Sequence, residues 1–193
     1  MDAIVGLAIQ CVRIVLVTIL TFFMRGSIKS FSLRYWTAAW CSLSISLASL
    51  YAGFHVSNPK LLYSVYFLGE HAFGLLFVAG CRFHLTAQRL TRRYGYLFAV
   101  SFLTALSLPY LSQDFNDLFM VQATIMAALF ASAFAVLHRS GLKESSPGLR
   151  VRSIALLLLT IDFLHYLPVF GARKGLLGFT VPSGYLNSLQ FSI

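Results

Sequence analysis

The chain is 193 residues long and contains 58% hydrophobic but only 11% charged residues, with a mean hydropathy of +0.77. A water-soluble domain carries about 25% charged residues, so this composition excludes an ordinary soluble fold. The formal net charge of +9 is not carried by a basic module with interleaved aromatic residues. We therefore expect no nucleic-acid partner, and we expect the basic residues to contact anionic membrane lipid.

The apolar residues fall into separate runs of roughly twenty, the length that a helix needs to cross about 30 Å of hydrocarbon. Each run must close its own backbone hydrogen bonds, because lipid offers no water to satisfy them. The runs do not alternate apolar and polar residues, as the strands of a membrane β-barrel would. In chain order they cover residues 3–24, 35–57, 61–81, 94–111, 116–137 and 153–170, and a seventh begins near residue 178. The sequence predicts one all-α domain over residues 1–193, a polytopic transmembrane bundle of about seven helices.

Lysine and arginine residues gather in alternate joints between these runs. The joints after the first, third and fifth runs hold Arg25, Lys29, Arg34, Arg82, Arg89, Arg92, Arg93, Arg139, Lys143, Arg150 and Arg152. The other joints hold only Lys60, Arg173 and Lys174. The positive-inside rule places the richer set in the cytoplasm, with the amino terminus outside and, for seven helices, the carboxyl end inside. We expect a multi-pass protein of the inner (plasma) membrane.

The two ends of the chain carry separate expectations. The first run lacks a basic leader, exceeds the length of an apolar signal core and has Arg13 in its middle, so we expect a retained helix. Residues 179–193 would span about 22 Å as a helix, which is too short to cross the membrane. We expect this helix to continue beyond Ile193 into a cytoplasmic domain, and the alternative is a re-entrant helix.

Five ionisable residues lie near the middle of three predicted helices, namely Arg13, Glu70, His71, Asp162 and His165. Each such group costs about 2.5–3.5 kcal/mol inside a membrane, so these groups are usually paired or functional. Asp162 and His165 are three residues apart and therefore share a helix face. The most economical arrangement is one polar cluster inside the bundle, with Arg13 facing Glu70 or Asp162.

Three interpretations of this cluster stay open. Arg13 and one carboxylate could form a structural ion pair that fixes the helix register. The cluster could instead sense a ligand or proton, because histidine changes its charge near neutral pH. Two imidazoles and a carboxylate also suit zinc, copper or iron. However, adjacent Glu70 and His71 diverge by about 100° around a helix, which disfavours a shared metal.

Weaker signals complete the candidate set. Tyr66 shares a face with Glu70 and could line a pocket, and Gln122 could form a hydrogen bond across the bundle. The predicted ligand-sensing residues are Arg13, Tyr66, Glu70, His71, Gln122, Asp162 and His165. No catalytic residue and no metal are predicted, the cysteines Cys11, Cys41 and Cys81 lack Cys-x-x-Cys spacing, and the sequence does not identify a cofactor. Small residues in the third run predict close helix approach at Gly69, Gly74 and Gly80.

Three stretches carry a family resemblance: residues 33–40 (LRYWTAAW), residues 79–83 (AGCRF) and residues 152–168, which include IDFLHYLP. Together they resemble the multi-helix amino-terminal membrane sensor domains of bacterial signalling proteins, chiefly diguanylate cyclases with a GGDEF output and histidine kinases. In the third stretch Asp162 precedes a single His165, whereas the family has an aspartate after a histidine pair. The resemblance implies a cytoplasmic output domain after residue 193, joined through the seventh helix, and a homodimer.

The leading hypothesis is a sensory input domain without catalysis of its own in these residues. A small ligand, lipid, or proton or redox cue at the cluster would favour one of two helix packings, provided that it binds them with different affinity. The last helix would pass this change to the output domain. The rival hypothesis is a small transporter or vitamin-uptake subunit that binds its solute in the same cluster and needs no downstream domain.

Overall fold

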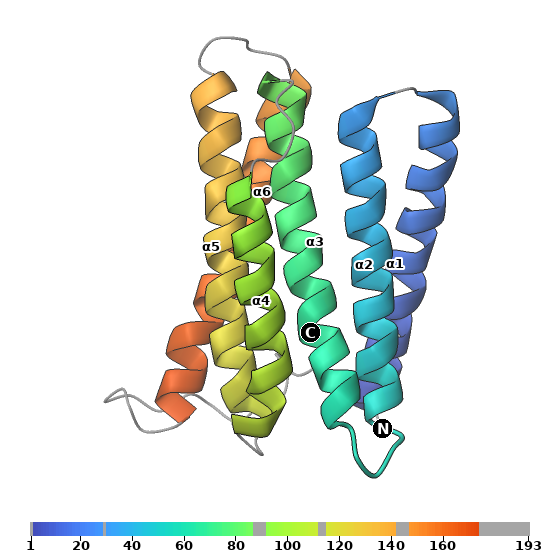
Figure 1. The fold of residues 1–193 in the computed structure, drawn as a ribbon, viewed down its shortest axis with the longest axis vertical. Coiled ribbons are helices and arrows are strands. Elements are labelled where there is room, and N and C mark those ends of the chain that lie inside the picture. The colour runs from blue at the N-terminus through green and yellow to red at the C-terminus, as the bar shows by residue number, and fades with distance from the viewer. Residues whose placement is uncertain (1, 29, 87–91, 112–114, 142–146, 174–193) are drawn as a thin grey trace.

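The computed structural model describes residues 2–28, 30–86, 92–111, 115–141 and 147–173, and these residues form six α-helices (Figure 1). The helices are α1 (Asp2–Ser27), α2 (Phe31–Gly53), α3 (Lys60–Thr86), α4 (Arg92–Leu111), α5 (Phe115–Gly141) and α6 (Pro147–Arg173). The all-α class is therefore confirmed, and each of the first six apolar runs corresponds to one helix. The predicted seventh helix lies outside the described residues.

The second helix differs most from its predicted bounds of 35–57. It begins at Phe31, directly after the extended Ser30, because the mixed segment 31–34 (FSLR) already has helical geometry. It ends at Gly53, and the amide of Phe54 then donates to the carbonyl of Leu50. Residues 54–59 form the connection to α3. Pro59 disfavours helical geometry in Asn58, the residue before it. Hydropathy alone could not locate either end.

Within the described residues, four helical segments are long and apolar enough to cross a membrane. They are Ile4–Ser27, Lys60–Leu85, Leu118–Arg139 and Arg150–Ala172, and the apolar segment Gly95–Leu111 is shorter. Large apolar side chains on these segments stay outward, such as Phe23 with 71% and Val151 with 67% of its surface exposed. Such a surface fits a membrane protein, because lipid covers apolar side chains that water would not.

Helix α2 falls outside this apolar group because hydroxyl side chains recur along it. Most of these hydroxyls bond to backbone carbonyls, as Thr37 does to Leu33 at 2.8 Å and Ser42 to Ala38 at 3.0 Å. Ser46 reaches across to α3 and donates to the carbonyl of Tyr66 at 2.7 Å. The hydroxyl groups of α2 thus have hydrogen-bond acceptors, mostly backbone carbonyls of α2 itself and, for Ser46, a carbonyl of α3.

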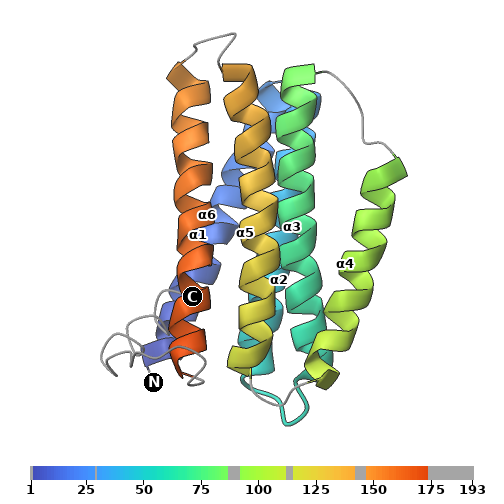
Figure 2. The same cartoon turned by 90° about the vertical axis from the view of Figure 1, so that its left-hand side faces the viewer.

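Helix α3 is the centre of the bundle. It packs against α2, α4 and α5, while α1 packs mainly on α2 and α6 mainly on α5 (Figures 1 and 2). The predicted close approaches on α3 are confirmed: a Cβ at Gly69 would lie 2.7 Å from Ser46, and one at Gly80 would lie 2.5 Å from Trp36. A Cβ at Gly74 would meet Leu129 at 2.7 Å. These glycines let α2 and α5 lie directly against α3.

Candidate ligand-binding site

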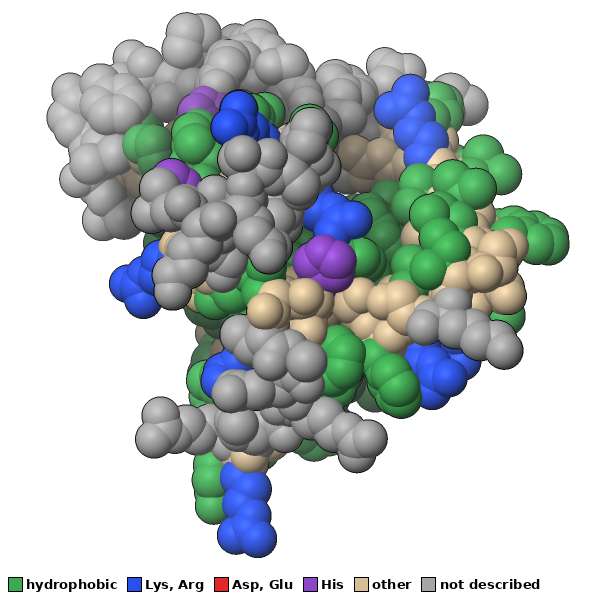
Figure 3. All heavy atoms as spheres, turned by 90° about the horizontal axis from the view of Figure 1, so that it is seen from above, with side chains coloured by type: hydrophobic (Ala, Val, Ile, Leu, Met, Phe, Trp, Pro, Cys, Tyr) green, Lys and Arg blue, Asp and Glu red, His purple; other side chains and the backbone are tan. Residues whose placement is uncertain are grey.

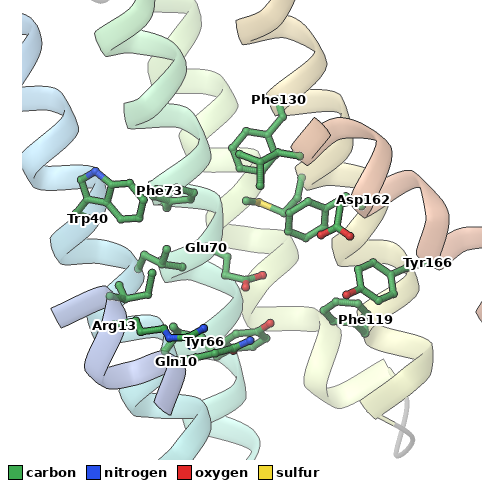
Figure 4. Close-up of a pocket in the computed structure, with 16 residues that line it drawn as sticks. Gln10, Arg13, Trp40, Tyr66, Glu70, Phe73, Phe119, Phe130, Asp162 and Tyr166 are labelled. Carbon is green, nitrogen blue, oxygen red and sulfur yellow. The ribbon is translucent and has the colours of Figure 1, made fainter. Parts of the chain in front are cut away.

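A cavity of about 330 Å³ lies between α1 and α2 on one side and α5 and α6 on the other, with α3 behind it (Figure 4). Ligand pockets in proteins typically measure about 300–1,000 Å³ and combine apolar walls with a few polar groups. The cavity has this composition, because twelve of its sixteen lining residues are aromatic or aliphatic. The other four lining residues are Gln10, Arg13, Glu70 and Asp162.

Aromatic side chains from four helices form much of the cavity wall. Trp40 of α2 packs on Phe73 of α3 with ring centroids 5.3 Å apart, and Phe73 packs on Phe130 of α5 at 6.0 Å. Phe130 then contacts Phe163 of α6 at 5.6 Å. Rings at these separations make favourable tilted contacts. The wall is therefore continuous from α2 to α6 and presents ring faces and edges to the cavity.

Glu70 is the most deeply buried charged group of the cavity, with 7% of its surface exposed. The side-chain amide of Gln122 on α5 donates to its Oε2 at 2.8 Å. Tyr66, one helical turn earlier on α3, is fully buried and interacts with the same carboxyl group. Figure 4 shows Glu70 and Tyr66 directed into the space that Asp162 and Tyr166 face from α6. Polar groups from three helices thus meet around one carboxyl group.

Arg13 and Asp162 stand on opposite sides of the same cavity, on α1 and α6 (Figure 4). Arg13, Glu70 and Asp162 were expected to share one space inside the bundle; all three line this cavity, but Arg13 and Asp162 are exposed and only Glu70 is buried. The structural ion pair, one of the three interpretations that the sequence left open, is not formed: in the described part of the chain Arg13 has no salt bridge with Glu70 or Asp162. The two helices that carry Arg13 and Asp162 pack mainly on other partners, which holds the two charges apart.

The two histidines do not face the cavity. His71 is fully buried and points toward α4, where its Nδ1 lies 3.2 Å from the carbonyl oxygen of Ser101. Its divergence from Glu70 follows from the 100° turn between successive helical residues. His165 shares a face with Asp162 as predicted, and both line a shallow outward hollow on α6. Among the described residues, no three His, Cys, Asp or Glu side chains are grouped to hold a metal ion.

Four of the seven predicted residues, Arg13, Tyr66, Glu70 and Asp162, therefore line one cavity. Gln122 donates a hydrogen bond to Glu70 without lining the cavity, and the two histidines do not line it either. Sequence reasoning missed Gln10 and Tyr166. Gln10 precedes Arg13 by three residues and Tyr166 follows Asp162 by four, so helical spacing would have placed both on the cavity face. The aromatic wall had no such signal, because its residues occur in runs that are apolar throughout.

The fold is a helical bundle whose described residues include four helices long and apolar enough to cross a membrane, and a ligand-sized cavity lies between its helices. Comparison of the chain with protein-family models, characterised proteins and solved structures finds no match. The function must therefore be argued from the cavity itself.

Proposed function

We propose that this chain is a membrane-embedded input domain that binds a small amphipathic ligand between its helices. The observation that carries this proposal is the shared cavity, to which five helices contribute both an aromatic wall and ionisable groups. A structural core would be filled by side chains at interior packing density. The charged groups at this site surround a space of ligand size and do not neutralise one another directly.

The charge and shape of the cavity favour a ligand that carries a cationic group on an apolar body. Among the described lining residues, Glu70 and Asp162 offer two carboxyl groups to a cation, whereas Arg13 supplies one guanidinium. Aromatic faces attract cations with about 0.5–2 kcal/mol each, and the wall of the cavity is largely aromatic. A zwitterion would use Arg13 and Gln10 for its acidic end.

The route of the signal runs through α6. This helix contributes Leu159, Asp162, Phe163 and Tyr166 to the cavity, whereas α1 contributes Arg13 from the opposite side. A ligand that contacts both helices binds the packing that brings them together more tightly, and this difference in affinity shifts the equilibrium between packings. We propose that α6 and a seventh helix pass the shift to a cytoplasmic output domain within a homodimer.

The proposed topology places the amino terminus outside and the end shown in Figure 3 in the cytoplasm. Basic side chains are spread over this end, and no described acidic side chain is visible on it. Arg25, Arg34, Arg82 and Arg152 lie toward the helix ends that the proposal places in the cytoplasm. This distribution supports a cytoplasmic position through the positive-inside rule. A multi-pass protein of the inner membrane follows from the same proposal.

The two tryptophans of the chain allow a direct test. Trp40 lines the cavity and Trp36 does not, so each can be kept as the sole fluorescent reporter. Titrating phenethylammonium into the full-length Trp36→Phe protein in lipid nanodiscs should change the Trp40 emission saturably. Neutral phenethyl alcohol, which has the same body, should change it much less.

The matched control is Trp40→Phe, in which the remaining Trp36 should not respond. Glu70→Gln and Asp162→Asn should each weaken the response by about tenfold, which corresponds to about 1.4 kcal/mol. An equal response from both tryptophans, or binding that ignores both carboxyl groups, would refute the proposed site. Accumulation of labelled phenethylammonium inside proteoliposomes beyond one molecule per chain would favour a transporter instead.

A further inference from the structure

A line of buried polar groups leads from the cavity through α5 to α4. Glu70 accepts a hydrogen bond from Nε2 of Gln122 at 2.8 Å, and Nδ1 of His71 lies 3.2 Å from the carbonyl oxygen of Ser101. His71 and Gln122 are near enough for an electrostatic interaction, although no hydrogen bond joins their facing atoms, and both are fully buried. The line therefore connects the cavity with α4, a helix that contributes no residue to the cavity wall.

At one point along this line, two hydrogen-bond acceptors face each other without a donor between them. A backbone carbonyl only accepts, so Nδ1 of His71 must carry a proton toward Ser101. Gln122 donates with Nε2 to Glu70, which leaves its Oε1 as an acceptor toward His71. A neutral His71 would present a second acceptor there, and in the described residues neither its Nε2 nor Oε1 of Gln122 has a hydrogen-bond partner. Buried polar atoms are seldom left in this way.

Two arrangements of the protons would pair every donor with an acceptor among Glu70, Gln122 and His71. In the charged arrangement, His71 is an imidazolium that donates from Nε2 to Oε1 of Gln122, and Glu70 is a carboxylate. In the uncharged arrangement, the amide of Gln122 turns by half a rotation, accepts from a protonated Glu70 and donates to Nε2 of a neutral His71. The two ends of an amide are nearly identical in shape, so both arrangements fit the same space.

The two arrangements contain the same number of protons and the same net charge. Conversion to the charged form breaks one O–H bond at Glu70 and forms one N–H bond at Nε2 of His71, while Gln122 turns between them. The other titratable groups near Glu70 are Tyr66 on the same helix and Arg13, Asp162 and Tyr166 around the cavity. None of these groups has to gain or lose a proton when the proton moves from Glu70 to His71.

We propose that Glu70, Gln122 and His71 form a two-state proton relay that is uncharged at rest and becomes charged when a cation enters the cavity. Burial of all three side chains favours the uncharged form, because separated charges are costly away from water. A cation beside Glu70 stabilises its carboxylate, so the proton moves to His71. The bond to the Ser101 carbonyl then gains a charged donor and strengthens, which pulls α4 toward α3. The second step rests on the proposed function, whereas the resting state does not.

The resting state can be measured without a ligand. Infrared spectra of the full-length protein in lipid nanodiscs at neutral pH should contain the C=O band of a buried carboxylic acid. This band should disappear in Glu70→Gln, shift in Glu70→Asp and persist in Asp162→Asn. Nitrogen NMR should find His71 neutral, with its proton on Nδ1. A Glu70 carboxylate together with a His71 imidazolium at rest would overturn the proposal.

The switching step is tested by adding phenethylammonium, with binding followed independently through Trp40. On binding, the acid band should be lost and the signal of a doubly protonated His71 should appear. In Gln122→Met, which has a similar length but no amide, the ligand should no longer change His71. Bound ligand with unchanged Glu70 and His71 signals in the native protein would refute the relay. A failure of the ligand to bind at all would refute the proposed function while leaving the resting-state result to decide the relay.

Discussion

Replacing Gly69 with alanine would place a methyl group in the closest contact between α2 and α3, the most extensively packed helix pair of the bundle. The new Cβ would lie 2.7 Å from Cβ of Ser46 and 2.9 Å from the carbonyl oxygen of Ser42. Ordinary contacts begin at 3.4 Å, so α2 would have to retreat by about 0.7 Å. Backbone atoms of α2 take part in the clash, so a change of rotamer cannot relieve it.

The expected cost follows from three contributions. Overpacking of this kind costs about 1–3 kcal/mol. The retreat also stretches the 2.7 Å bond from Ser46 to the carbonyl of Tyr66, and such a bond contributes about 0.5–1.5 kcal/mol. Alanine recovers about 0.5–1 kcal/mol because glycine is the weaker helix former. We therefore expect Gly69→Ala to lower the free energy of unfolding by about 0.5–4 kcal/mol.

The measurement is denaturant unfolding in detergent micelles, followed by circular dichroism. Gly95→Ala is the matched control, because it makes the same change on α4 where a Cβ would meet nothing within 4 Å. This control should leave stability unchanged or raise it by up to about 1 kcal/mol. Equal effects of the two substitutions would show that α2 and α3 do not approach as closely as the structure places them.

Three further substitutions test the cavity wall, the contact between Arg152 and Trp36, and the buried amide. Phe130→Ala should lower the free energy of unfolding by about 3–5 kcal/mol. The control Phe23→Ala removes a side chain that is 71% exposed and should change it little. Similar losses in both variants would contradict the placement of Phe130 in the core. Arg152→Gln removes the guanidinium that lies 4.5 Å from the ring of Trp36. It should cost about 0.5–2 kcal/mol and should have no effect once Trp36 is replaced by leucine. Gln122→Leu leaves the buried carboxyl group of Glu70 without its hydrogen-bond partner and should cost about 1–3 kcal/mol in thermal unfolding. Unchanged stability would mean that the amide is not bonded to Glu70.

Much of the candidate site was predictable because helical geometry is local. The shared face of Asp162 and His165 and the divergence of Glu70 from His71 both follow from residue spacing within one helix. The partner of each group was not predictable in this way. The sequence left open an ion pair between Arg13 and a carboxylate, yet Glu70 is bonded to Gln122 on another helix, and that choice depends on how α3 packs on α5.

By itself, the sequence determined the helical class, the six described helices and the glycines at which helices approach closely. Each of these depends on residues near one another in the chain: an apolar run must bond to itself in lipid, and a glycine leaves room for any neighbour. Only the tertiary structure decided that Trp40, Phe73, Phe130 and Phe163 form one wall, and that a cavity remains beside it. Every face of an apolar helix is chemically similar, so the hydropathy of the sequence cannot say which face meets another helix and which meets lipid.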